Sequence, residues 1–202
     1  MSKFLIAEKL HMSQIFTKDG KVVPVTILKA TPNKITQVRT LEKDKYQAVQ
    51  LGFKRTKNAS KALAGHTKEL GNFAKIAEFR VDDASKFSRG QEITVSTFAV
   101  GDKVKATAEM KGRGFAGPIK RHGFHGAPMS HGHDHPRAVG AIGGRFPQHV
   151  RKGLRMAGHM AGVRTVKNLE VVEIDTERNL IAVKGAVPGA PGGIVRLQLV
   201  IK

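Results

Sequence analysis

The chain has 202 residues and a formal net charge of +19, because 35 Lys and Arg outnumber 16 Asp and Glu. This excess favours a polyanionic partner, nucleic acid first and an anionic membrane surface second, and argues against an enzyme acting on small neutral substrates. The absence of Cys excludes disulfides and a cysteine-based zinc site, as fits a reducing cytosol. The 40% of hydrophobic residues is enough for a core, and no apolar run reaches the roughly 18 residues of a membrane span.

The first half of the chain contains short stretches with the apolar–polar alternation typical of half-buried strands. Gln14–Thr17 and Val22–Leu28 flank Lys18–Lys21, where Asp-Gly indicates a hairpin turn. Residues 60–75 are predicted to form a short helix with Ser60 as its N-cap. Further strands are predicted over residues 35–38, 46–51, 92–98 and 104–110.

Basic residues concentrate in the middle of the chain. Between Lys105 and Arg164 there are eleven basic residues but only two acids, Glu109 and Asp134, so the net charge is +9. The same stretch holds seven of the nine His and twelve of the 22 Gly, and its apolar residues follow neither a period of 2 nor one of 3.6. We therefore expect no separate core here, but an extended segment over residues 108–162 that becomes ordered against a partner.

Three more strands are predicted after this segment, over residues 165–174, 180–184 and 194–201. Neither flank has enough strands to close a sheet alone, so we expect residues 1–107 and 163–202 to fold together. Seven or eight short strands with turns between them favour a mainly β fold, an antiparallel barrel or sandwich, into which the basic segment is inserted.

The stretch His131-Gly-His-Asp-His135 is the first candidate for chemistry. In a strand, its histidines would point to one face and could bind a transition metal, so a metal-dependent hydrolase using His131, His133 and His135 is the alternative function. However, Glu109 and Asp134 are the only carboxylates of this region, and no second metal-binding cluster accompanies them. A polar, RNA-facing loop is the preferred interpretation, and we predict no catalytic residue, no metal and no cofactor.

Glycines alternate with basic residues in Lys111–Gly117 and in Arg151–Gly162. The first stretch is followed by Pro118, and so matches neither a P-loop nor a dinucleotide-binding loop. Glycine instead lets the backbone lie against sugar and phosphate, while cations pair with phosphates and a phenylalanine stacks on a base. A barrel module that binds another polyanion, such as DNA or an acidic membrane, stays open as an interpretation of these residues.

Several motifs together resemble the bacterial ribosomal large-subunit protein L-three family. They are Lys111–Arg121 (KGRGFAGPIKR), Ser130–Gly132, Ala141–Gly143, Lys152–Gly158 (KGLRMAG) and Val183–Gly189 (VKGAVPG). The resemblance implies a structural, non-catalytic protein with a β-barrel of the kind shared with translation factors. It implies a long loop, inserted between barrel strands, that reaches into large-subunit rRNA towards the peptidyl-transferase region. It also implies binding early in subunit assembly, neighbouring large-subunit proteins as partners, and a cytoplasmic location in that subunit.

The resemblance also indicates which side chains of the loop contact rRNA. It places at such positions Lys111, Arg113, Lys120, Arg121, His131, Arg137, Lys152 and Arg155. Charge and aromatic character add Phe115, Arg145 and Arg151 to the predicted rRNA-binding residues. No membrane and no small-molecule substrate is expected as a partner.

Overall fold

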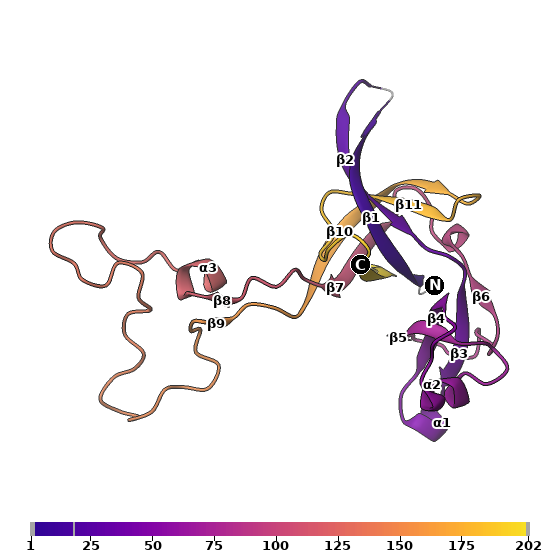
Figure 1. Ribbon diagram of the computed structural model, residues 1–202, viewed down its shortest axis with the longest axis horizontal. Helices are drawn as coiled ribbons and strands as arrows, with labels where there is room; N and C mark the ends of the chain where they lie inside the picture. The colour runs from indigo at the N-terminus through magenta and orange to yellow at the C-terminus, as the bar shows by residue number, and fades with distance from the viewer. Residues whose placement is uncertain (1–2, 18, 201–202) are drawn as a thin grey trace. The chain divides into compact units, whose positions relative to one another are not determined.

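The computed structural model describes residues 3–17 and 19–200, and it is mainly β, as predicted. Lys18 of the predicted hairpin turn and Ile201 of the last predicted strand lie outside the described residues. The chain divides into two compact units: a globular unit, which extends up to Met110 and resumes at Val163, and the arm, Lys111–Gly162. Strands make up most of the globular unit, whereas irregular loops make up most of the arm (Figure 1). No helix in the described part of the chain is long and apolar enough to cross a membrane.

Six antiparallel strands of the globular unit pair in a closed ring and form a barrel. Around the ring they are β1 (Phe4–Phe16), β12 (Ile194–Leu199), β7 (Lys103–Glu109), β10 (Val163–Asp175), β11 (Leu180–Lys184) and β2 (Val22–Lys29). Strand periodicity decides which side chains face the interior: Val104, Ala106 and Ala108 of β7 are buried, and the residues between them are not. The register places Ala106 opposite Leu197 and Ala108 opposite Val195, both buried in β12.

A second sheet of four strands completes the globular unit. Its strands, in order, are β5 (Phe73–Arg80), β4 (Ala48–Arg55), β3 (Asn33–Arg39) and β6 (Glu92–Ile93). The expectation of seven or eight strands in one barrel or sandwich is therefore corrected to a six-stranded barrel and a separate sheet. Alternation identifies the buried face of a strand, but it does not reveal which sheet the strand joins.

Strand β1 contributes to two cores, because both of its faces are buried. Leu5 and Ala7 belong to the barrel core, while Phe4 and Ile6 belong to the core of the second sheet. The Ile6 N–H donates to Asn33 Oδ1 (3.0 Å), and Asn33 Nδ2 donates to the Ile6 carbonyl (3.1 Å), which joins β1 to β3. A continuous apolar run is typical of a strand buried on both faces, and a search for alternation therefore missed the first part of β1.

The predicted helix over residues 60–75 is shorter than expected. Helix α2 covers only Lys61–His66, where Ser60 Oγ accepts a hydrogen bond from the Leu63 N–H (3.3 Å) as the predicted N-cap. β5 then begins at Phe73, whose ring is buried, and tertiary burial of this kind outweighs the weak preference of a short segment for helix. The other helices of the globular unit's described residues are α1 (Leu41–Asp44) and a 3-10 helix (Val95–Thr97), which lies within the strand predicted over 92–98 and leaves only Glu92–Ile93 of it as β6.

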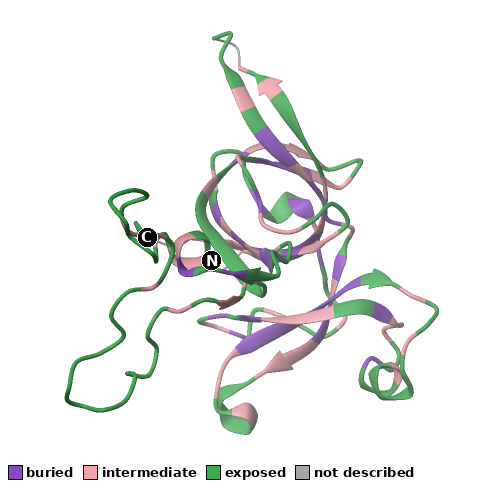
Figure 2. Cartoon of the chain, turned by 60° about the vertical axis from the view of Figure 1, so that its left-hand side comes forward, coloured by how far each residue is buried: buried purple, intermediate pink, exposed green. Residues whose placement is uncertain are grey.

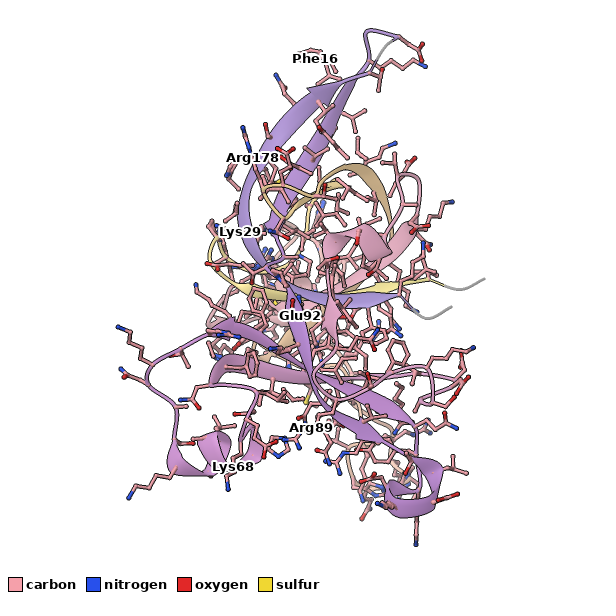
Figure 3. All side chains as sticks on the ribbon, turned by 90° about the vertical axis from the view of Figure 1, so that its right-hand side faces the viewer. Phe16, Lys29, Lys68, Arg89, Glu92 and Arg178 are labelled. Carbon is pink, nitrogen blue, oxygen red and sulfur yellow. The ribbon has the colours of Figure 1, made fainter. Side chains whose placement is uncertain are left out.

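Strands β1 and β2 continue past the buried part of the barrel as a two-stranded hairpin. Phe16, near the tip, pairs with Val22 across the hairpin, and both side chains are exposed (Figure 3). A hairpin alone has no second layer to cover its faces. The described residues at the end of this hairpin therefore add no buried side chains to the core of the globular unit.

Candidate nucleic-acid interface

The two ends of the arm are held together by backbone hydrogen bonds. Strands β8 (Phe115–Ala116) and β9 (Gly158–His159) form a two-stranded sheet at its base. The Arg113 N–H donates to the Met160 carbonyl (3.0 Å), and the Met160 N–H donates to the Gly114 carbonyl (2.8 Å), which lengthens this ladder. The chain therefore enters and leaves the arm through one short two-stranded sheet.

A short helix and one arginine organise the base of the arm further. Helix α3 covers Pro118–His122, with proline at its start and a glycine in the left-handed conformation at its C-cap. Arg121 Nη1 donates to the Met156 carbonyl (2.9 Å), and His122 Nε2 donates to the same oxygen (2.9 Å). A Cβ at Gly158 would lie 2.7 Å from Arg121 Nη1, so glycine is what allows the guanidinium to pack here. Arg121 thus has an internal structural contact besides its predicted role towards RNA.

Beyond its base, the arm has almost no buried apolar surface. Figure 2 shows its loops as almost entirely exposed. Met129 and Phe146 are each 75% exposed, and even Phe115 of β8, at the base, is 78% exposed. Exposed rings and thioethers of this size contribute little to folding, whereas they can stack on bases or fill cavities of a partner. The predicted lack of a separate core agrees with this burial pattern.

The cations of the arm are not compensated by acidic residues of the arm itself. The arm contains nine Lys and Arg and a single acid, Asp134. None of these groups forms an ion pair within the arm, whose residues are all described. Of the predicted contact residues, Arg121 alone is half-buried, and the rest are exposed: Lys111, Arg113, Phe115, Lys120, His131, Arg137, Arg145, Arg151, Lys152 and Arg155. These positive charges are thus available to an external anion.

Histidines surround a hollow of about 770 Å³ in the arm. Its lining includes His122, His125, His133, His135 and Arg155, whereas His131 is not part of it. The His135 N–H donates to His133 Nδ1 (3.3 Å), and both residues lie in an irregular loop rather than in a strand. Among the described residues, no group of three or more His, Cys, Asp and Glu is close enough to hold a metal ion. The cluster proposed for a hydrolase is therefore not assembled, and the imidazoles surround a space larger than an ion.

A second hollow, of about 350 Å³, lies farther along the arm. Ile142, Phe146 and Arg151 contribute to its lining, and the Arg145 guanidinium lies 5.9 Å from the centroid of the Phe146 ring. Sequence reasoning singled out Arg145 and Arg151 by charge but missed Phe146, because periodicity reports core positions and not exposed rings. The signal that could have found it is a Phe next to Arg in a segment without a core.

The chain thus combines a β-rich globular unit with a basic arm that has almost no buried apolar surface. The profile of the family "Ribosomal protein L3" matches residues 28–184, which is more than half of the chain. The chain is 46% identical over 207 residues to the large ribosomal subunit protein uL3 of Pelotomaculum thermopropionicum, with 100% of this chain and 99% of that protein covered. It is 48% identical over 200 residues to the protein of the same name from Thermosipho melanesiensis, with 97% of each covered. The chain therefore belongs to the ribosomal protein L3 family, whose members are structural proteins and not enzymes.

Proposed function

We propose that this chain is a structural component of the large ribosomal subunit and binds large-subunit rRNA directly, mainly through phosphates along the arm. The observation that carries this proposal is the set of nine basic residues in the arm, opposed by one acid and free of ion pairs within it. Uncompensated cations on a flexible backbone displace counterions from RNA, which supplies most of the affinity in such contacts. The relatives are named as large-subunit proteins, which supports the same partner and a cytoplasmic location in that subunit.

The finer parts of the proposal follow from the family resemblance. The barrel is of the kind shared with translation factors, residues 108–162 extend into the rRNA towards the peptidyl-transferase region, and the protein supports early assembly of the subunit. Neighbouring large-subunit proteins contact the globular unit. The exposed glycines and cations of the arm support close approach to a sugar–phosphate backbone, because glycine has no Cβ to clash with it.

The salt dependence of binding tests the central claim. If the arm neutralises about six to ten phosphates, the affinity of the full chain for large-subunit rRNA should fall roughly 10³–10⁵-fold between 50 and 200 mM salt. Fluorescence anisotropy or filter binding over this range measures the change. An affinity that varies by less than about threefold would contradict the proposal.

Charge reversal in the arm tests the same claim in cells. We expect Lys111→Glu, Arg113→Glu and Lys120→Glu, combined in a tagged chain, to prevent its incorporation into large subunits on a sucrose gradient. Arg121 is left intact, because it holds the base of the arm through Met156 and its loss would also disturb folding.

The matched control for that variant reverses three exposed lysines of the globular unit, Lys29, Lys43 and Lys68. It changes the net charge by the same amount, and we expect it to be incorporated normally. If both variants enter large subunits equally well, the arm is not the main contact.

A generic polyanion-binding module is the second candidate, because the charge pattern alone fits DNA or an acidic membrane as well. Sedimentation of the tagged chain from a lysate separates the two candidates. Co-migration with large ribosomal subunits after a moderate salt wash supports the ribosomal role, whereas release into the DNA or membrane fraction supports the alternative.

A further inference from the structure

A basic hollow of about 440 Å³ lies in the globular unit, on the outer side of three barrel strands. β7 contributes Lys105 and Thr107, β12 contributes Arg196, and Thr165 comes from β10. The neighbours of these residues along β7 and β12 point into the barrel core, so the pleat directs Lys105, Thr107 and Arg196 outward. Arg196 is directly opposite Thr107 in the register. Arg80 of β5 completes the basic lining.

The single carboxylate that lines this hollow is engaged elsewhere. Glu78 accepts hydrogen bonds from Tyr46 Oη (3.0 Å) and Gln50 Nε2 (3.2 Å), and its Oε1 lies 3.5 Å from Arg39 Nε. In the described part of the chain, neither Arg80 nor the two cations of the barrel strands form an ion pair. Three positive charges therefore face one hollow without a carboxylate of their own.

The neutral groups of the hollow are also suited to an oxyanion. The hydroxyls of Thr107 and Thr165 form a hydrogen bond with each other (2.8 Å), in which one donates and the other keeps its hydrogen for an outside acceptor. The Gln198 amide adds donors, and Val163 adds an apolar wall. Guanidinium and ammonium groups bind phosphate oxygens through charge-assisted hydrogen bonds, which are stronger than neutral ones.

We propose that this hollow is a second anion site, which binds phosphodiester groups of the RNA backbone independently of the arm. The hollow is larger than one phosphate, so a phosphate with its ribose fits, the sugar against Val163. Strands of the barrel and of the second sheet hold these side chains before binding, so less ordering is required than in the arm. This inference rests on the proposed RNA-binding function and adds a site that motif reasoning did not reach.

The test compares two full-length triple variants of equal charge. The site variant carries Arg80→Gln, Lys105→Gln and Arg196→Gln, and the control carries Lys29→Gln, Lys43→Gln and Lys68→Gln. We expect the site variant to lower the slope of log affinity against log salt by roughly 2–3, because each phosphate contact contributes about 0.7–0.9. The control should leave the slope within about 0.5 of the wild type. Equal slopes for the two variants would overturn the site.

Further measurements separate loss of the anion site from unfolding of the sheet and from failure of the proposed function. A variant with Arg80→Lys, Lys105→Arg and Arg196→Lys keeps the charges and should retain most of the slope, and its thermal unfolding shows whether the sheet is intact. Inorganic phosphate and an RNA hairpin are titrated separately while the amide resonances of Thr107 and Thr165 are followed. A response to inorganic phosphate alone would overturn the assignment to RNA. Wild-type binding that does not depend on salt would instead overturn the proposed function itself.

Discussion

The globular unit buries most of its large apolar side chains, whereas the arm exposes most of them. Phe4 and Phe53 of the globular unit are at most 2% exposed, and Phe115 of the arm is 78% exposed. Burial of such a ring stabilises a fold by roughly 1.5–3 kcal/mol, which offsets the entropy of ordering the chain around it. The arm lacks this contribution, and its regular elements are limited to β8, β9 and α3. One chain thus combines a unit that has a buried apolar core with a segment that has almost none.

Limited proteolysis should give the largest difference between the two units. We expect trypsin to cleave within residues 111–162 at least about a hundredfold faster than in the globular unit, because segments with few buried contacts open at little free-energy cost. Only nine of the 35 Lys and Arg lie in the arm, so the number of sites does not favour it. Mass spectrometry of early fragments locates the cuts. If trypsin cleaves the arm no faster than the barrel, the inferred difference in stability between the two units is wrong.

Truncation of a buried ring and of an exposed ring should differ next most strongly. Phe53→Ala is expected to lower the free energy of unfolding by about 3–5 kcal/mol, because it leaves a cavity in the core of the second sheet. Phe115→Ala removes the same atoms from the arm surface and should change the free energy of unfolding by less than about 0.5 kcal/mol. Urea denaturation measures both. Similar losses would mean that the arm has a core of its own.

Glycine substitutions test how tightly each unit is packed. A Cβ at Gly52 would lie 2.6 Å from the buried Phe73 ring, so we expect Gly52→Ala to destabilise the protein by roughly 1–3 kcal/mol. At Gly143 in the arm, no heavy atom lies within 4 Å of such a Cβ and the backbone φ is not in the left-handed region. Gly143→Ala should therefore be neutral within about 0.5 kcal/mol. Thermal unfolding of the two variants provides the measurement.

Acid stability should show the smallest effect. Lys3 Nζ donates to Asp102 Oδ2 (2.7 Å), and this contact, together with the Ala99 N–H (2.9 Å), lowers the pKa of Asp102. Since the folded-state pKa lies below the unfolded one, this stabilisation is complete above about pH 4 and is lost as pH falls through the folded-state value. Asp102→Asn should therefore destabilise the protein at pH 7 by at most about 1 kcal/mol, and the difference should shrink as the pH falls through the folded-state pKa of Asp102.

The control for acid stability is Asp134→Asn in the arm. Asp134 is exposed and forms no ion pair with the described residues. We expect the same stability as the wild type from pH 7 down to pH 2, measured by urea denaturation at each pH. A loss equal to that of Asp102→Asn would show that general charge, and not the Lys3 contact, sets the acid sensitivity.

Local patterns predicted the bounds of some strands closely. β11 was predicted over residues 180–184 and occupies Leu180–Lys184, and β7 was predicted within one residue at each end. Local patterns failed where tertiary contacts override the preference of a segment for helix or strand. β5 occupies the end of a predicted helix, because its residues pair with β4 and bury Phe73. The candidate interface was also predicted only in part. Charge identified the cations of the arm from the sequence, whereas the contact of Arg121 with Met156 was revealed only by the structure.

By itself, the sequence determined the mainly β character, the position of the basic segment and the family resemblance, because periodicity, charge density and ordered motifs are local properties. Only the tertiary structure decided that the strands divide between a six-stranded barrel and a separate sheet, and that β1 serves both cores. It alone brought Arg80, Lys105 and Arg196 to one hollow. These features depend on pairings between strands far apart in the chain, and the alternation within one strand does not encode its partner.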